Sequence, residues 1–274
     1  MNQIKACLAL CILLFIASCS HDVTIQNLSK VQLYSNIVRL DTNKSLSFTE
    51  LLNELDSIDV LLVGELHYDK NHRLAQISLI NELSKRKKLD VAMEMISSEK
   101  QNLIDKAYQD NVHINEILGA INWDKNWRIS HYGEIVKTAY EKANLKAANL
   151  SKSEIDTIFS GAEPIKGVVS TTQSVKEMIA TAIGLAHVAD EKMRNKLVQA
   201  QLYKDRRMAD VLNKTQNFSL LIAGVFHTHK DVGVPLHLID FNTQKRVKVL
   251  ILGSSDYRLD DVNIYKADYF WQFR

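Results

Sequence analysis

The chain has 274 residues, with 34 lysines and arginines against 32 aspartates and glutamates and a formal net charge of +2. So balanced a charge argues against nucleic acid as the main partner, and the length suits one globular domain. Apolar runs of strand length alternate with segments of helical periodicity. This pattern predicts an α/β fold in which helices flank a mostly parallel sheet.

The N-terminus has the form of a secretory signal. Lys5 precedes an apolar run over residues 6–17, which is too short to span a bilayer comfortably and ends in the letters IASC at Cys19. That ending resembles a bacterial lipobox, so we expect residues 1–18 to be removed and Cys19 to carry lipid. Ser20, rather than an aspartate, follows the cysteine, which resembles the sorting signal of outer-membrane lipoproteins. An ordinary signal peptide with an incidental cysteine is the alternative.

Removal of the signal would leave Cys19 as the one cysteine, because Cys7 and Cys11 precede it. A chain without a second cysteine forms no internal disulfide and has no thiolate for catalysis or for a metal site. We expect residues 19–45 to be a lipidated tether and residues 46–274 to be a single domain.

Within that domain, six strands are predicted, at residues 60–64, 89–95, 145–150, 218–224, 247–252 and 265–271. Ser98 with Gln101 and Ser151 with Glu154 have the spacing of capping boxes, which open helices. Trp123 and Trp127 are expected in the core rather than as stacking platforms.

A helical insertion is predicted at about residues 160–213, between the third and fourth strands. Its apolar face is broader than one helix stripe needs and comprises Met178, Ile179, Ala182, Ile183, Leu185 and Ala186. Such a face usually covers the core. It could instead form a lid or a dimerisation surface, since contiguous apolar patches mark binding surfaces.

Two predicted strands end in the same phrase, G-x-x-H: Gly64 precedes His67, and Gly224 precedes His227. Because ligands bind at the carboxyl ends of parallel strands, the two phrases could face one pocket. Glu65 and Glu94 also fall at strand ends. Carboxylates with imidazoles suit a metal site or acid–base catalysis.

The other histidines rank lower. His72 and His229 are second-rank candidates for the site, and the histidines expected at the surface or in the core are His21, His113, His131, His187 and His237. In the helix predicted at 196–212, Arg206 and Arg207 follow Tyr203 by three and four residues, so one guanidinium shares its face and would favour a phenolate. The alternative is a tyrosine packed at a helix surface.

Six segments between about residues 61 and 238 carry a family resemblance. They read GELHYDKNH, DVAMEM, W-x-x-x-W before HYGEIV, LKAANLS, AQLYKDRRMAD and LLIAGVFHTHKDVGVP. In this order they resemble the ChaN-like haem-binding lipoproteins, part of a wider group with Tiki, TraB and erythromycin-esterase-like proteins. The resemblance implies an α/β fold, haem capture in iron acquisition, and haem held at a homodimer interface with its iron bound by tyrosine. An outer-membrane haem receptor is a candidate partner.

The chain departs from the family pattern after the first G-E-x-H. Tyr68 and Asp69 follow where Asp-Asn is usual, and Arg73 replaces the second histidine of the usual pair. Of the tyrosines that the resemblance implies as iron ligands, Tyr203 is our first choice and Tyr68 our second.

Four further side chains are candidates for binding the haem: His67, His227, Lys230 and Arg207. Histidine and lysine suit the propionates because both donate to carboxylates. The alternative function is a metal-dependent hydrolase, anchored in the envelope, that uses Glu65, His67, Glu94 and His227.

Overall fold

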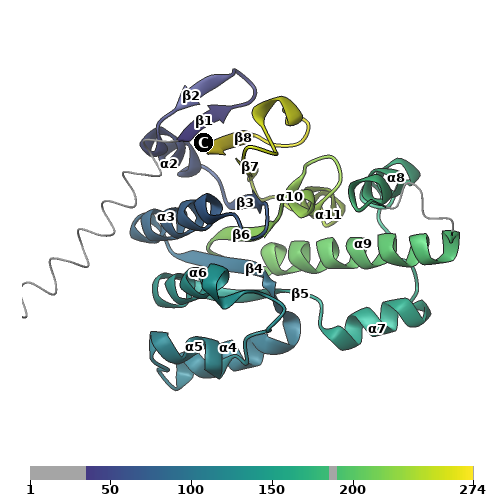
Figure 1. Ribbon diagram of the computed structural model, residues 1–274, viewed down its shortest axis with the longest axis horizontal. Coiled ribbons are helices and arrows are strands. Elements are labelled where there is room, and N and C mark those ends of the chain that lie inside the picture. Colours follow the sequence, from purple (N-terminus) through teal and green to yellow (C-terminus); the bar gives the residue numbers. More distant parts are fainter. Residues whose placement is uncertain (1–34, 185–189, 274) are drawn as a thin grey trace, which may run out of the picture.

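An eight-stranded sheet with helices on both faces forms the centre of the molecule (Figure 1). The computed structural model describes residues 35–184 and 190–273. The strand order is β2-β1-β8-β7-β3-β6-β4-β5. The strands are β1 Ser35–Arg39, β2 Lys44–Leu46, β3 Val60–Glu65, β4 Leu89–Ser97, β5 Asn144–Asn149, β6 Phe218–Gly224, β7 Val247–Gly253 and β8 Tyr269–Phe273.

The six strands from β8 to β5 are parallel to their neighbours, whereas β1 runs antiparallel to both β2 and β8. The predicted α/β fold with a mostly parallel sheet is therefore confirmed. The helices are α2 Phe48–Leu55, α3 Lys70–Arg86, α4 Gln101–Gln109, α5 Ile117–Ala120, α6 Ile129–Lys142, α7 Lys152–Gly161, α8 Gln173–Ala182, α9 Glu191–Lys214, α10 Val225–Thr228 and α11 Val234–Asp240.

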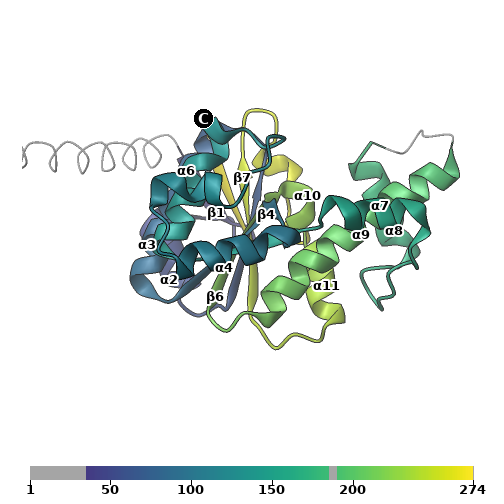
Figure 2. The same cartoon turned by 90° about the horizontal axis from the view of Figure 1, so that it is seen from below.

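The helices divide between the two faces according to the strand alternation. Leu61 and Val63 of β3 pack in the cluster that includes α2 to α6, and Val60 and Leu62 pack in the cluster that includes α9 and α11. Successive side chains of a strand point to opposite faces, so the continuous apolar run of β3 supplies both cores. Figure 2 shows the helices on the two sides of the strands.

The segment between β5 and β6 carries α7, α8 and α9, which extend to one side of the sheet (Figure 2). Val175 and Ile179 of α8 pack on Leu202 of α9. Met178, on the other side of α8, is 39% exposed. Leu185 and Ala186, which belong to the apolar face predicted for this segment, lie outside the described residues.

The predicted boundary between the tether and the domain, at residue 45, lies too late in the chain. Residues up to 45 were assigned to it, but Ile37 pairs with Leu46 of β2 and with Trp271 of β8. Ile37 and Leu46 are buried, so the domain includes at least residues 35 onward. Strands β1 and β2 are short and contain few apolar residues among polar ones, so their sequence gave no clear strand pattern. The signal, Cys19 and the rest of the tether lie outside the described residues.

Two local predictions are wrong. The last strand begins at Tyr269 rather than at residue 265. Ser98 and Gln101 form no capping box: the Ser98 hydroxyl donates to Glu154 (2.9 Å), and the Gln101 side chain accepts the N–H of Ala147 on the edge strand β5 (2.8 Å). Tertiary partners thus replaced the local contact. The box at Ser151 and Glu154 is present.

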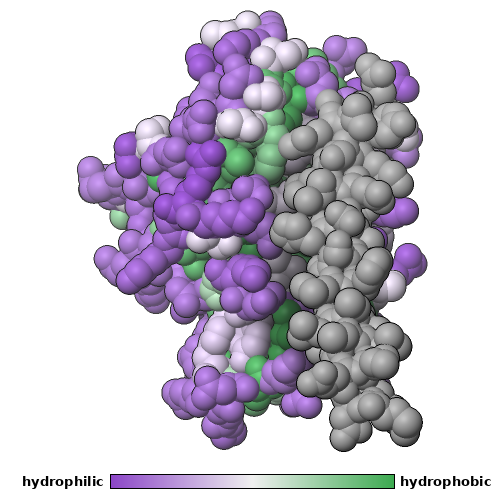
Figure 3. All heavy atoms as spheres, turned by 90° about the vertical axis from the view of Figure 1, so that its left-hand side faces the viewer, coloured by the Kyte–Doolittle hydropathy of each residue, from purple (hydrophilic) through white to green (hydrophobic). Residues whose placement is uncertain are grey.

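The face shown in Figure 3 is mostly hydrophilic, with smaller hydrophobic patches between polar side chains. In the described part of the chain, no helix has both the length and the apolar character needed to cross a membrane.

Candidate functional site

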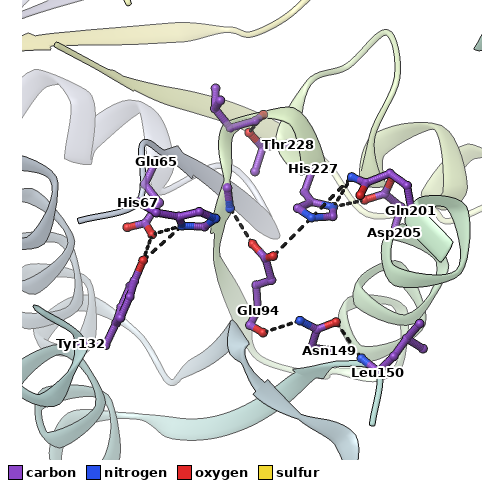
Figure 4. Close-up of polar contacts among 12 residues, drawn as sticks. Glu65, His67, Glu94, Tyr132, Asn149, Leu150, Gln201, Asp205, His227 and Thr228 are labelled. Carbon is purple, nitrogen blue, oxygen red and sulfur yellow. Dashed lines mark hydrogen bonds and ion pairs between the residues drawn. The ribbon is translucent and has the colours of Figure 1, made fainter. Parts of the chain in front are cut away.

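The two G-x-x-H phrases lie side by side at the carboxyl edge of the sheet. Strands β3 and β6 are adjacent and parallel, with Glu65 opposite Gly224. On its other edge β6 pairs with β4, so Glu94 near the end of β4 faces the same place. The sequence predicted this meeting of strand ends, and Figure 4 shows the side chains that gather there.

Glu65 and His67 form a fixed pair on one side of the cluster. Oε1 of Glu65 lies 2.8 Å from Nδ1 of His67 and accepts the hydroxyl of Tyr132 at 2.5 Å, while Oε2 accepts the side-chain amide of Gln76 at 2.5 Å. A carboxylate only accepts, so Nδ1 of His67 carries the hydrogen. The pair therefore orients the other ring nitrogen, Nε2, toward Gly224 (Figure 4).

The charges of this pair follow from its surroundings. Burial opposes a charge on His67, but the hydrogen bond that His67 donates to Glu65 and the charge of Glu94 outweigh it and raise the pKa of His67. Burial and the neighbouring Glu65 carboxylate raise the pKa of Tyr132 far above its usual value. Tyr132 is therefore a permanent donor to Glu65.

The second half of the cluster is a buried imidazole between two carboxylates. Nε2 of His227 lies 3.3 Å from Oε1 of Glu94, and its Nδ1 lies 2.5 Å from Oδ1 of Asp205 on α9. The N–H of Gly224 donates to the other Glu94 oxygen at 2.7 Å, and the side-chain amide of Gln201 lies 2.9 Å from Nδ1 of His227. These contacts join α9 to the sheet.

The two carboxylates keep His227 protonated. Burial alone would lower its pKa, but the charges of Glu94 and Asp205 raise it well above the usual value. The pKa of Glu94 is lowered despite burial because of the charge on His227. For Asp205, burial prevails and raises the pKa. The cluster thus holds more negative than positive charge, which suits a neutral or cationic group better than an anion.

The second-rank histidines have structural partners. Nδ1 of the fully buried His72 accepts the N–H of Leu66 at 3.0 Å, and its Nε2 donates to the carbonyl of Gly253 at 3.0 Å. Both ring nitrogens are used, so His72 holds the loop after β3. His229 lies 3.0 Å from the hydroxyl of Tyr257, and burial lowers its pKa to about 4.

The remaining candidates have partners outside the strand-end cluster. The Tyr203 hydroxyl donates to the carbonyl of Glu163 (2.5 Å), Arg207 pairs with Glu154, and Lys230 pairs with Asp268 at 3.2 Å. Arg206 binds His237 and Asp240. The expected guanidinium partner of Tyr203 is therefore wrong, because both arginines bind carboxylates on other elements.

Tyr68 lies close to the cluster but faces outward. Its ring is 6.2 Å from that of His67, and its hydroxyl donates to the carbonyl of Asn126 at 3.4 Å. The ring of Trp127 meets His67 edge-on at 5.1 Å. Trp123 is in the core as expected, and Trp127 packs partly against it.

The sequence did not identify three side chains of the cluster: Gln76, Tyr132 and Asp205. Gln76 and Tyr132 have no local signal, because each meets Glu65 only after the chain has folded. Asp205 had one, since it follows Gln201 by four residues and so shares its helix face. That pair of polar side chains on a buried helix face marks the partner of His227.

An apolar cavity of about 480 Å³ lies between α8 and the loop after α10. Its apolar lining comprises Met178, Ala182, Phe226 and Val232, and His229 and Lys266 are among its polar lining residues. Phe226 is 42% exposed. Glu177 and Asp231 also line the cavity, so its apolar wall is bordered by charges of both signs.

An α/β sheet with paired G-x-x-H strand ends and a helical insertion defines the class of this protein. A family model described as haem-binding uptake, Tiki superfamily, ChaN matches residues 51–238. The chain belongs to this family. The resemblance stated from the sequence motifs is confirmed.

The chain is 37% identical to a solved structure described as cofacial haem binding to ChaN of Campylobacter jejuni. The match covers 88% of this chain and 97% of that one, with a TM-score of 0.81. Two more distant similarities are an erythromycin esterase mutant (13% identity, 76% and 74% covered, TM-score 0.48) and a succinoglycan biosynthesis protein (8%, 92% and 97%, TM-score 0.49). Neither bears on function. The comparison with curated proteins gave no match.

Proposed function

We propose that this protein is an outer-membrane lipoprotein, anchored through Cys19, that binds haem in haem and iron acquisition. The observation that carries the proposal is the extended similarity to a protein described as binding haem cofacially, together with membership of a haem-binding family. An outer-membrane haem receptor is the partner that would supply or accept the haem.

The porphyrin is assigned to the apolar cavity between α8 and α10. Met178 and Phe226 offer it apolar surface, and Lys266 offers a cation to a propionate. The strand-end cluster is a poorer place for the porphyrin because Glu65, Glu94 and Asp205 are buried and already paired with His67 and His227. His67 and His227, our earlier candidates for propionate binding, are therefore better suited to holding the two strand ends together.

Iron ligation is assigned to a tyrosine, with Tyr203 as first choice and Tyr68 as second. Each hydroxyl now donates to one backbone carbonyl, a contact that iron would replace. Among the described residues that line the α8–α10 cavity there is no tyrosine. A second copy of the chain that supplies the tyrosine would place the haem at a homodimer interface.

Absorption spectra of the hemin complex test the ligand. Tyr203→Phe should remove the tyrosinate-type spectrum, whereas Tyr108→Phe should not, because the Tyr108 hydroxyl is committed to Ala143 and Leu145 inside the fold. An unchanged spectrum with Tyr203→Phe and a lost one with Tyr68→Phe would transfer the role to Tyr68.

Hydrolysis is a second candidate function, favoured by one observation at Glu65 and His67. Nδ1 of His67 is held by Glu65, while its Nε2 has no hydrogen-bond partner among the described residues, and the side chain is 35% exposed. An imidazole oriented by a carboxylate is the arrangement of a general base. In residues 35–184 and 190–273 no group of three or more potential ligands is arranged to hold a metal ion, so the metal-dependent form has no specific support.

Turnover of a neutral ester such as p-nitrophenyl acetate tests this candidate. Glu65→Gln should abolish turnover while leaving hemin binding intact, because the haem is assigned to another part of the fold. If the parent chain turns over no more ester than the variant, the Glu65–His67 pair is structural.

A further inference from the structure

We propose that one surface at the carboxyl edge of the sheet rests on an anionic phospholipid bilayer. This surface, called the loop surface below, consists of residues 66–73, which are the loop after β3 and the first turn of α3, and residues 122–130, which are the loop before α6 and its first two residues. The inference goes beyond haem binding, and only the nearness of the membrane rests on the proposed lipid anchor.

The topology places Ser35, the first described residue, at the same edge as the loop surface. Strand β1 is antiparallel to β8, with Ser35 opposite Phe273, and β8 is parallel to β7, which is parallel to β3. The chain therefore enters the sheet at the carboxyl ends of the parallel strands, where β3 also ends. Fifteen residues lie between Cys19 and Ser35, so the two can be at most about 55 Å apart when the chain is fully extended.

The loop surface carries four cations, Lys70, Arg73, Lys125 and Arg128. Among the described residues, none of them forms an ion pair with a carboxylate. The two carboxylates in these loops are already used by the backbone: Asp69 caps α3, and Asp124 accepts the N–H of Asn126. The surface thus has excess positive charge available to lipid phosphates.

Apolar and aromatic side chains stand among these cations. Ile129 is 58% exposed, Tyr68 is 38% exposed, and Trp127 is half-buried beside them. Tyrosine and tryptophan favour the level of the lipid headgroups, and lysine and arginine pair with anionic lipids. This mixture fits a bilayer surface better than water alone or a haem propionate.

The two loops form one rigid unit. Arg73 donates to the carbonyl of Ser130 at 2.6 Å, Tyr68 donates to that of Asn126, and the Arg128 guanidinium lies 4.6 Å from the centre of the Tyr68 ring. Tyr68 has a φ of +72°, a left-handed conformation that costs a bulky residue about 1–3 kcal/mol. The contacts that hold Tyr68 outward outweigh this strain.

An acidic loop lies at the same edge of the sheet as the loop surface. The loop after β7 at the same edge contains Asp256, Asp260 and Asp261 with Arg258. Anionic lipid repels this loop, so the molecule must lie tilted, with the loop surface toward the bilayer.

Vesicle binding by residues 19–274 with Cys19→Ser tests the proposal without the lipid anchor. The chain should sediment with vesicles of phosphatidylcholine and phosphatidylglycerol and much less with phosphatidylcholine alone. Because each cation near an anionic surface contributes about fivefold in affinity, Lys70→Gln, Lys125→Gln and Arg128→Gln together should weaken binding by roughly 100-fold.

The matched control changes the same number of charges elsewhere. Lys88, Lys152 and Lys192 are exposed on other parts of the fold, and their replacement by glutamine should weaken binding only slightly. An equal loss in both triple variants would show an effect of net charge and overturn the proposal. No binding of the parent chain to the anionic vesicles, or binding to lipopolysaccharide only, would also overturn it.

An environment-sensitive label distinguishes contact of the loop surface with the bilayer from electrostatic attraction of the whole protein. A fluorescent label at Ile129→Cys, in the Cys19→Ser chain, should shift its emission to the blue on vesicle binding, and the same label at Lys88→Cys should not. Equal shifts at both positions would contradict a defined orientation. Failure of either test leaves the hemin titration unaffected, so the haem proposal is judged separately.

Discussion

Gly224 and His67 approach so closely that a Cβ added at position 224 would stand 2.9 Å from Nε2 of His67. The backbone of Gly224 is in an ordinary extended conformation, with φ −56°, which any residue can adopt. A glycine is needed here because a larger side chain would collide with His67. The contact joins the ends of β3 and β6.

Replacing that glycine should destabilise the fold. The added methyl of Gly224→Ala must displace His67, and overpacking of this kind costs about 1–3 kcal/mol. Urea unfolding measures the loss. Gly119→Ala is the control, because a Cβ there meets no atom within 4 Å and should change stability by less than about 1 kcal/mol. Equal stability of the two variants would contradict the contact.

Glu94→Gln should destabilise the fold and lower the pKa of His227. The substitution removes one of the two charges that keep the buried imidazole protonated, and breaking a buried pair costs about 3–5 kcal/mol. The cost should fall at the lower end because Asp205 remains. Histidine NMR titration and urea unfolding check both results; Glu99→Gln, at an exposed carboxylate, should change neither.

His237 should make the protein sensitive to acid. Burial and Arg206 lower its pKa from 6.5 to about 3, and its Nδ1 accepts from Arg206 at 2.9 Å, so the folded state keeps it neutral. The unfolded state binds the proton first. Stability is therefore full above about pH 6.5 and falls toward pH 3, by at most about 1.4 kcal/mol per pH unit. His237→Gln should flatten the pH dependence of unfolding; an unchanged slope would contradict this account.

Asp240 holds the loop before α8 against α11. Its carboxylate accepts the N–H groups of Val168 (3.0 Å) and Val169 (2.8 Å) and the hydroxyl of Ser170 (2.5 Å), and it pairs with Arg206. Asp240→Ala removes all four contacts.

Hydrogen exchange measures the effect of that loss. Amides 168–170 should exchange at least about tenfold faster, since a hydrogen bond to a charged group contributes about 1.5–3 kcal/mol. Asp156→Ala, at an exposed site on α7, should leave these amides unchanged. Unchanged exchange in Asp240→Ala would show that other contacts fix the loop.

Buried parallel strands were the most predictable part of the fold. The predicted limits of the strands β3, β4, β5, β6 and β7 agree with the structure to within two residues, because such strands are short continuous apolar runs. Strands β1 and β2 were missed because their sequence is mostly polar and because β1 joins the sheet through β8, more than 200 residues later.

Of the site, the sequence could predict only the residues that the ends of the parallel strands bring together. The meeting of Glu65, His67, Glu94 and His227 follows from parallel topology, and the structure shows it. Their hydrogen-bond partners come from helices whose packing the sequence does not specify. For the same reason, the spacing of Tyr203 and its arginines predicted a contact that tertiary ion pairs replaced.

Titration of the mature chain with hemin tests the central claim most directly. Absorption spectra and sedimentation should together show saturable binding, a tyrosinate-type spectrum and conversion of monomer to dimer as haem is added. The absence of saturable binding, or binding to a monomer with an imidazole-type spectrum, would contradict the account.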